Sequence, residues 1–457
     1  MDTKKLRQKI LDLAIHGKLV PQDPNDEPAS VLLERIRAEK ERLIAEGKIK
    51  RSKKSATSDT SHYENVPQSW VICKLADVCY FESGYAFSSD DYSQSGTPLV
   101  RISNIIDSQI SLESCVYINS ECDKRFHVKK GDLLIAMSGA TTGKMGVYDS
   151  NETAFLNQRV GNIKVINENV LLNDYRNIFM HSQIDNILEL AYGGAQPNIS
   201  ANIICSLPIP IPSIKEQKRI VTTVDKWFSL IDTLESAKDD LQTSITQAKS
   251  KILDLAIHGK LVPQDPDDEP ASELLKRFNP KFVPCDNAHY ENVPEGWCTI
   301  YVGDLAEYTN GKAFKPSDWE QNGLPIIRIQ NLNDENCQYN YTSITHEEKY
   351  RISHGDLLFA WAASLGVYIW QGNKAWLNQH IFKVDPHPFI DKQYLYYIFE
   401  YLVSEFYTRS HGSGMVHITK KEFETTIALL PPLSEQRRIV KSIKSYYTTL
   451  DNISANL

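Results

Sequence analysis

The stretch KILDLAIHGKLVPQDPNDEPAS, from Lys9 to Ser30, decides the fold because the chain contains it twice. The second copy occupies residues 251–272 and differs at one position only. Each copy starts with apolar residues at helical spacing, reaches a glycine, and continues into a segment rich in proline and aspartate. Glycine commonly ends a helix and proline cannot continue one. The stretch therefore predicts a helix end followed by a corner, and it indicates an internal duplication.

Further matches extend the duplication over the whole chain. HYENVPQSW at 62–70 returns as HYENVPEGW at 289–297, and PLVRISNI at 98–105 returns as PIIRIQNL at 325–332. The shorter matches are GDLLIA at 131–136 with GDLLFA at 355–360, LNQ at 156–158 and 377–379, and EQ at 216–217 and 435–436. The protein is therefore expected to be a two-fold repeat.

Composition restricts the class of protein. The chain has 457 residues, a formal net charge of -8 and a pI of about 5.9, which excludes a basic nucleic-acid binder but leaves room for a local basic face. Its eight cysteines form no CxxC pair, so neither zinc nor a redox pair is expected. The sequence shows no membrane-length apolar run and does not begin like a signal peptide. We expect a cytoplasmic protein with reduced thiols.

Two segments have the pattern of strand-rich domains. From Trp70 to Pro212, and again from Trp297 to Pro432, short apolar runs alternate with Gly, Ser and Asn. This pattern predicts two similar α+β domains, with one helix near residues 173–190 of the first. The first segment holds 10 Lys and Arg against 15 Asp and Glu, and the second holds 11 against 15. That balance argues mildly against tight DNA binding by this chain alone.

The clearest periodicity lies between these domains. Apolar residues alternate in steps of four and three, which predicts a coiled-coil helix of about 45 residues, on the order of 65 Å long. The same periodicity ends the chain and continues at its start, so the two termini are expected to form a second helical rod antiparallel to the first. The predicted seam consists of Ile220, Val224, Trp227, Ile231, Leu234, Leu241, Ile245, Ile252, Leu255, Ile439, Ile443, Tyr446, Leu450, Leu6, Ile10 and Leu13.

These patterns divide the chain into five segments. The predicted boundaries are 1–61 for an N-terminal helical region and linker, 62–212 for the first domain, 213–288 for the central helix and corner, 289–432 for the second domain, and 433–457 for the C-terminal helix. The basic run KIKRSKK at 48–54 is interpreted as a solvated linker, with phosphate contact as the alternative.

This arrangement resembles the DNA-specificity subunit of type I restriction-modification systems. The resemblance rests on the corner repeat, the helix starts IPIPSIKEQKRIV and LPPLSEQRRIV, the GDLLIAMSG segment and the LNQ motif. It implies two target-recognition domains, each reading one half of a split DNA sequence, with two long antiparallel helices that set the spacer.

The same resemblance implies the partners and cofactors. Two modification subunits, which carry S-adenosylmethionine and methylate adenine, would dock on the helices, and a restriction subunit with motor and nuclease activity would join for cleavage. S-adenosylmethionine, ATP and magnesium are expected on those partners, and none of them on this chain.

The sequence lacks the loops that catalysis would need. No [DNS]PP[YF] loop for a flipped adenine is present, and GATTGKM at 139–145 departs from phosphate-binding loop spacing. A methyltransferase or nuclease acting alone is therefore disfavoured. A structural adaptor with two strand-rich domains that bind proteins or glycans remains the alternative from another class.

Candidate DNA-binding residues are polar side chains in turns and at strand ends of both domains. Arginine pairs with guanine, and amides pair with adenine, but each candidate could instead contact phosphate or stabilise the fold. The candidates in the first domain are Arg101, Ser103, Asn104, Ser138, Thr141, Thr142, Lys144, Gln158, Arg159, Gln196 and Asn198. Those in the second domain are Lys312, Lys315, Arg328, Gln330, Asn331, Ser364, Gln379, His380, Ser413 and His417.

Overall fold

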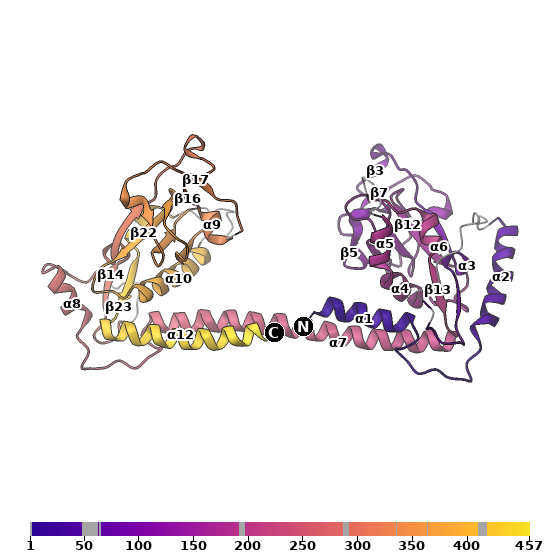
Figure 1. The fold of residues 1–457 in the computed structure, drawn as a ribbon, viewed down its shortest axis with the longest axis horizontal. Coiled ribbons are helices and arrows are strands. Elements are labelled where there is room, and N and C mark those ends of the chain that lie inside the picture. Colours follow the sequence, from indigo (N-terminus) through magenta and orange to yellow (C-terminus); the bar gives the residue numbers. More distant parts are fainter. Residues whose placement is uncertain are drawn as a thin grey trace. The chain divides into compact units, whose positions relative to one another are not determined.

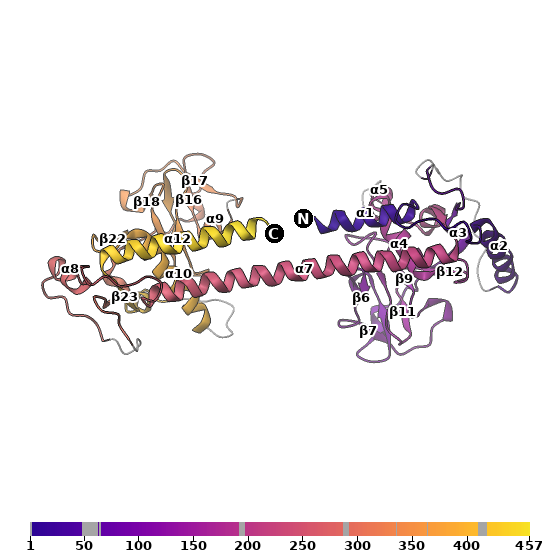
Figure 2. The same cartoon turned by 90° about the horizontal axis from the view of Figure 1, so that it is seen from below.

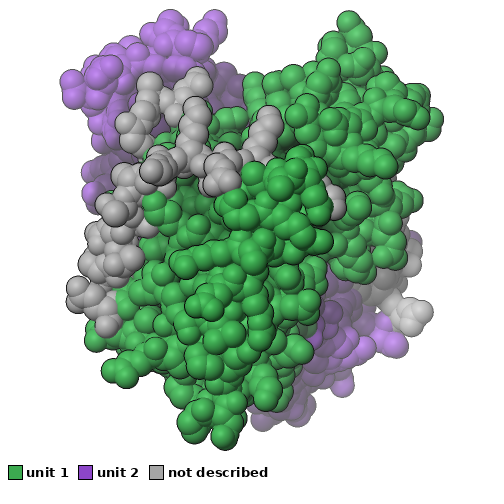
Figure 3. Space-filling view, turned by 90° about the vertical axis from the view of Figure 1, so that its right-hand side faces the viewer, with its two compact units in different colours: residues 1–237 green, residues 238–457 purple. Residues whose placement is uncertain are grey.

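The computed structural model divides into two units, residues 1–237 and 238–457 (Figure 3). It describes residues 2–47, 63, 65–191, 197–286, 292–334, 336–362, 364–409 and 418–457. The division falls inside the long helix α7, Ile214–Ile257, so each unit contains one part of that helix. We describe each unit by itself.

Unit 1 contains helices packed against a strand-rich domain (Figure 1). Its helices besides α7 are α1 Thr3–Ile15, α2 Ala29–Ala45, α3 Leu75–Val78, α4 Asn173–Ser182, α5 Ile184–Ala191 and α6 Ala201–Ser206. Its strands are β1 Val71–Lys74, β2 Cys79–Ser83, β3 Tyr92–Ser93, β4 Thr97–Val100, β5 Ile105–Ile106, β6 Gln109–Ile110, β7 Val116–Ile118, β8 His127–Val128, β9 Leu133–Ala136, β10 Met145–Val147, β11 Ala154–Leu156, β12 Val160–Val165 and β13 Pro208–Ile211. The strands form a six-stranded sheet β2-β12-β9-β10-β6-β5, a five-stranded sheet β3-β7-β4-β11-β8 and the pair β1-β13.

Unit 2 repeats this plan with fewer strands. Its helices are α8 Ala271–Phe278, α9 Ile329–Asn333, α10 Lys392–Arg409, α11 Lys420–Glu424 and α12 Leu433–Ala455. Its strands are β14 Cys298–Tyr301, β15 Ala306–Asn310, β16 Leu324–Ile327, β17 Asn340–Thr342, β18 Arg351–Ile352, β19 Leu357–Ala360, β20 Gly366–Ile369, β21 Ala375–Leu377, β22 Ile381–Pro386 and β23 Ile427–Leu430. They form the sheets β15-β22-β19-β20 and β17-β16-β21-β18 and the pair β14-β23.

In unit 1, α1 packs antiparallel to the first part of α7 (Figure 2). Arg7 Nη2 lies 2.9 Å from the Glu235 carboxylate and pairs with Asp232, and its guanidinium lies 5.1 Å from the Phe228 ring centroid. One turn further along α1, the buried residues Ile10 and Leu11 join the core that contains Val224. The predicted pairing of the N-terminal helix with the central helix is confirmed.

In unit 2, α12 packs antiparallel to the second part of α7. Lys249 Nζ lies 2.5 Å from the Asp451 carboxylate, and Ser454 Oγ donates to Gln242 Oε1 at 2.8 Å. Lys249 also lies 5.2 Å from the Tyr447 ring, as Arg7 lies near Phe228 in unit 1. The two halves thus use equivalent cation pairs, whereas continuity of α12 with α1 across the units remains a prediction.

The predicted seam residues of α7 lie on two faces of the helix, one covered and one exposed. Ile220, Val224, Ile231 and Ile245 are buried, and Ile252 and Leu255 are half-buried. Trp227, Leu234 and Leu241, however, are 45 %, 44 % and 40 % exposed. Their assignment to the seam was wrong, because one face of the apolar stripe is enough to pack against a single partner helix and the domain.

The partner helices show the same separation. Ile10, Ile439 and Ile443 are buried, and Leu6, Leu13 and Leu450 are half-buried. Tyr446 is 50 % exposed, contrary to the prediction, and α1 buries Leu11 and Ala14 in addition to the predicted Ile10. The heptad pattern therefore located the helices correctly and the covered face only in part.

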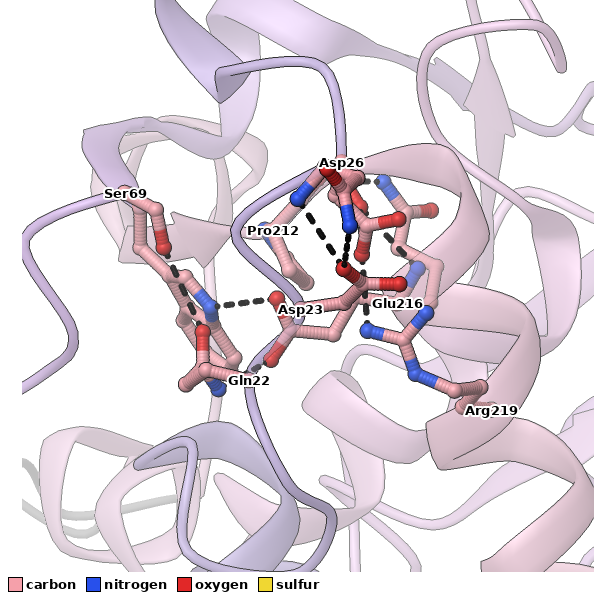
Figure 4. A network of polar contacts seen from close by, with 11 residues as sticks. Gln22, Asp23, Asp26, Ser69, Pro212, Glu216 and Arg219 are labelled. Atoms are coloured by element: carbon pink, nitrogen blue, oxygen red, sulfur yellow. Dashed lines mark hydrogen bonds and ion pairs between the residues drawn. The ribbon is translucent and has the colours of Figure 1, made fainter.

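The duplicated corner is joined to the helix start by buried hydrogen bonds (Figure 4). The Trp70 indole donates to Glu216 Oε2 at 3.0 Å, and the Gln22 amide donates to the other oxygen. Arg219 pairs with Asp26 at 2.7 Å. Burial raises the pKa of the Glu216 carboxyl, although these hydrogen bonds oppose the rise, and the Arg219 guanidinium lowers the pKa of Asp26.

Unit 2 has the same network with equivalent residues. The Trp297 indole donates to Glu435 at 2.9 Å, Gln264 donates to the same carboxylate at 3.2 Å, and Arg438 pairs with Asp268 at 2.6 Å. Gly17 and Gly259 end the preceding helices with φ of +66° and +68°. A Cβ at Gly17 would lie 2.5 Å from Pro67, so the corner requires glycine there.

A second buried side chain attaches each domain to its helix. Gln217 accepts from the Leu172 backbone N–H at 2.9 Å and donates to the carbonyls of Val170 at 2.9 Å and Pro212 at 3.1 Å. Gln436 makes the equivalent bonds to Asp391, Phe389 and Pro431. The EQ pair in each half is thus a structural junction.

The predicted fold class, two similar strand-rich α+β domains with long coiled-coil helices in a repeated arrangement, is confirmed. One detail was wrong: the helix expected near residues 173–190 is two helices, because α4 ends at Ser182 and α5 begins at Ile184, with the C-cap Gln183 between them. None of the helices within the described ranges is long and apolar enough to cross a membrane.

We expect Gln217→Ala to lower the free energy of unfolding by about 2 to 3 kcal/mol, because it leaves buried backbone groups without partners. Gln436→Ala should have the same effect in unit 2. Gln247→Ala, at an exposed position of α7, is the matched control and should change stability by less than about 0.5 kcal/mol. Urea unfolding measures all three, and equal stabilities would contradict the junction role.

Candidate nucleic-acid interface

In unit 1 the candidate residues gather where two parallel strands end. β4 and β11 pair in parallel, with Leu99 opposite Phe155 and Val100 opposite Leu156. The Asn157 N–H continues this pairing by donating to the Val100 carbonyl at 3.1 Å. Arg101 and the segment 157–159 therefore emerge side by side at the carboxyl ends of the strands.

The segment that follows β2 closes the same edge. Tyr85 N–H donates to the Leu156 carbonyl at 2.8 Å, and Gln158 N–H donates to the Tyr85 carbonyl at 2.9 Å. Gly84 permits this approach, because a Cβ there would lie 2.1 Å from the Asn157 carbonyl oxygen. Tyr85 is 48 % exposed, and Gln158 and Arg159 are also exposed.

The turn between β9 and β10 adds a third polar segment. Met137 N–H donates to the Arg159 carbonyl at 2.9 Å, and Ser138 forms a β-bridge with Asn198. Lys144 and Asn198 are exposed, and Ser138 is half-buried. We call this group the strand-end site of unit 1, consisting of Tyr85, Arg101, Ser103, Ser138, Lys144, Gln158, Arg159 and Asn198.

Unit 2 has an equivalent strand-end site. β16 and β21 are parallel, with Ile327 opposite Leu377, and Asn378 N–H donates to the Ile327 carbonyl at 3.0 Å. Lys312 takes the place of Tyr85, since its N–H donates to Leu377 and its carbonyl accepts from Gln379. The site of unit 2 consists of Lys312, Lys315, Arg328, Gln330, Ser364, Gln379 and His380.

Three side chains that were predicted to bind DNA instead form hydrogen bonds inside the domains. Asn104 accepts from the Arg101 backbone N–H at 3.0 Å and donates to the Ser111 carbonyl at 3.1 Å, and it is 3 % exposed. Asn331 makes the equivalent bond to Arg328 N–H at 3.1 Å. Thr142 donates to the carbonyl of Gly139 and lies within reach of that of Pro197. These buried bonds favour structural roles for all three.

Two other predicted residues are buried or hydrogen-bonded within the protein, and three lie outside the residues that the structure describes. Thr141 Oγ1 is buried without a hydrogen-bond partner among the described residues. Ser364 accepts a hydrogen bond from the Asn333 amide at 3.3 Å. Gln196, Ser413 and His417 lie outside the residues that the structure describes, as does the basic run at 48–54.

Two aromatic residues at the sites were missed by the sequence analysis. Tyr92 lies under Arg101, with 5.8 Å between the guanidinium carbon and the ring centroid, and Trp319 lies under Arg328 at 5.6 Å. Each aromatic residue precedes its arginine by the same number of positions. Aligning the repeats position by position would have revealed the pair.

Two histidines of unit 2, His380 and His346, have distinctive conformations or surroundings. His380 has a φ of +73°, a left-handed conformation that costs energy and is frequent at functional sites, and its ring contacts Trp361. Burial lowers the pKa of His346, and the nearby Lys312 ammonium lowers it further. Unit 1 has Arg159 at the position of His380, which changes the exposed chemistry.

The described ranges contain no group of three His, Cys, Asp or Glu side chains that could hold a metal ion. The exposed groups of both sites are amides, hydroxyls and cations, which bind by hydrogen bonding and charge. The arrangement is suited to recognition of a polar, anionic ligand.

Comparison with known proteins agrees with this assignment. The family model of the type I restriction modification DNA specificity domain matches residues 67–243 and again residues 294–457. The chain belongs to this family. Each match contains one strand-end site and all or part of the helix that follows its domain, so the family unit is repeated as the sequence is repeated.

Relatives extend the similarity over nearly the full length. The chain is 28 % identical to the specificity subunit of the type I restriction enzyme EcoAI from Escherichia coli, over 98 % of this chain and 90 % of that protein. It is 26 % identical to the EcoEI specificity subunit from the same species, over 99 % and 90 %. A solved structure of a type I restriction-modification system has the same fold, with a TM-score of 0.58, 18 % identity and coverage of 85 % and 93 %.

Adjacent substitutions separate the internal amides from the exposed sites. Asn104→Ala should lower the free energy of unfolding by about 1 to 3 kcal/mol, because it orphans the Arg101 N–H. Ser103→Ala, one residue away and exposed, should change it by less than about 0.5 kcal/mol. Thermal unfolding of the two variants checks this, and an unchanged stability of the Asn104 variant would contradict the structural role.

Proposed function

We propose that this chain recognises a two-part DNA sequence, with one half read by the strand-rich domain of each unit. The observation that carries the proposal is the duplicated strand-end site, in which one frame presents different exposed residues in the two units. Membership of the DNA specificity family and the specificity subunits among the relatives support DNA as the ligand.

The chemistry of the exposed residues suits base edges. Arg159 in unit 1 and Gln330 in unit 2 are exposed and offer guanidinium and amide groups that can form paired hydrogen bonds in the major groove. The differences between Ser103 and Gln330, and between Tyr85 and Lys312, would let the halves prefer different sequences. Polar residues that vary on a shared frame are typical of specificity determinants.

Within this proposal the chain is the non-catalytic subunit of a larger complex. Modification subunits would supply adenine methylation with S-adenosylmethionine, and restriction subunits would bring ATP and magnesium for cleavage. The net charge of -8 supports the need for partners, because additional cations would strengthen contact with the phosphate backbone.

The exposed apolar face of the helices supports docking of the modification subunits there. Trp227, Leu230 and Leu234 are 45 %, 49 % and 44 % exposed and follow helical spacing. In unit 2, Tyr446 and Ile453 occupy the positions equivalent to Trp227 and Leu234, and they are 50 % and 42 % exposed. Apolar stripes of this kind are typical of helix-binding surfaces, and their presence in each unit suits two copies of one partner.

Replacing residues 70–212 with the matching domain of a relative tests separate reading of the half-sites. We expect one half of the methylated sequence to change and the other to persist, because each domain has its own core and site. Methylation-sensitive sequencing of DNA from cells expressing the chimera with its modification subunit is the measurement. A change in both halves would contradict the division, and the chain without the modification subunit should methylate nothing.

Substitutions on the helix face test the docking surface. Trp227→Ala combined with Leu234→Ala should weaken binding of the modification subunit at least tenfold, since exposed aromatic anchors dominate such interfaces. Ser229→Ala, exposed on the same helix, is the control and should leave the affinity unchanged. Titration by mass photometry measures both, and equal affinities would place the docking surface elsewhere.

A further inference from the structure

Arg101 and Arg328 occupy equivalent positions in the two strand-end sites and are held in the same way. Each follows the last residue of a strand, β4 or β16, and each donates its backbone N–H to an asparagine three residues later. Each guanidinium lies over an aromatic ring, Tyr92 or Trp319. The backbone bond and the ring together fix the direction of the side chain.

Neither guanidinium has the partners that its burial would require. Both side chains are half-buried, and neither forms an ion pair with any residue in the described part of the chain. Both Nε atoms are buried and have no hydrogen-bond acceptor among the described residues. Arg328 Nη2 donates one long hydrogen bond, at 3.4 Å, to the Gln338 carbonyl. An unsatisfied buried donor costs roughly 1 to 3 kcal/mol, so its repetition in both units calls for an explanation.

Arginines that serve the fold of this protein are paired. The wholly buried Arg176 donates to the carbonyls of Ile163 at 2.6 Å and Gly131 at 2.8 Å. Arg219 and Arg438 pair with aspartates in the corner networks. A structural salt bridge, one of the alternatives for Arg101 and Arg328, is therefore not formed among the described residues.

The identity of the two arginines indicates which part of DNA they bind. Exposed residues on both sides of them differ, with Ser103 against Gln330 and Arg159 against His380, whereas the arginine, its asparagine and an aromatic ring beneath it occur in both units. A phosphate is the group that every half-site shares, whatever its bases. Arginine also binds phosphate through two parallel N–H donors, a geometry that a ring beneath the guanidinium plane leaves open.

We propose that Arg101 and Arg328 each bind a DNA backbone phosphate, in the same manner in both domains, and read no base. This inference rests on the proposed DNA-recognition function. Together they would set the position of the duplex on each domain, so that the divergent neighbours meet the base edges.

The test uses the complex of this chain with its modification subunit. Arg101→Gln, Arg328→Gln and the double variant are titrated with a target duplex and a non-target duplex over a range of salt concentrations. Each single variant should weaken binding to both duplexes by the same factor, about tenfold, and should reduce the salt slope by about one. The methylated sequence in cells should stay unchanged.

Arg35→Gln and Arg277→Gln are matched controls, because these exposed arginines of α2 and α8 are also repeat equivalents and pair with Glu27 and Glu269. They should leave affinity and salt slope unchanged. Arg101→Lys keeps the charge and covers the case in which the glutamine variant does not fold. It should preserve the salt slope while losing part of the affinity, because lysine lacks the two-donor plane.

Two results would overturn the inference while leaving the proposed function intact. Relaxation of the methylated sequence at one position, with non-target binding unchanged, would make the arginine a base reader. Unchanged affinity for both duplexes in folded variants would make it structural. If the wild-type complex bound neither duplex, the proposed function itself would fail, and the inference with it.

Discussion

The structure depends on a buried pair of hydrogen-bonding side chains at the start of each long helix. Glu216 holds the corner through Trp70 and Gln22, and its neighbour Gln217 holds the domain through three backbone bonds. Glu435 and Gln436 do the same in unit 2. Buried polar groups are costly when unpaired, so this junction admits one arrangement of corner, domain and helix.

The fixed junction allows the exposed residues of the domains to differ. The frame of each strand-end site is made of backbone pairing between parallel strands and of asparagines that bond inward. The exposed side chains at positions 85, 103 and 330, and the half-buried one at 312, take no part in that bonding. The two halves can therefore differ at these positions without disturbing the frame.

The sequence predicted the features that depend on local pattern. Repeats revealed the duplication, and heptads revealed the helices. Contacts between distant segments could not be predicted: nothing in the local sequence places Arg101 beside Gln158, because parallel pairing of β4 with β11 brings them together. Nor does a heptad tell which apolar face a partner covers, so Trp227 was misassigned. Asn104 and Ser103 look alike as polar residues, and only burial separates an internal amide from an exposed hydroxyl.

The corner also has a consequence for how the chain can be shortened. Because its two copies are nearly identical in sequence, joining one copy to the other at equivalent positions would keep the chain in register and remove everything between the joined positions. The product would begin with α1, pass through one corner, and continue with the second domain and α12. In this product Gln22 would take the place of Gln264 as the hydrogen-bond donor to Glu435. Asp26 would take the place of Asp268 as the ion-pair partner of Arg438. The repeat thus makes one domain with its corner a separable module, whose boundary coincides with a complete set of corner contacts.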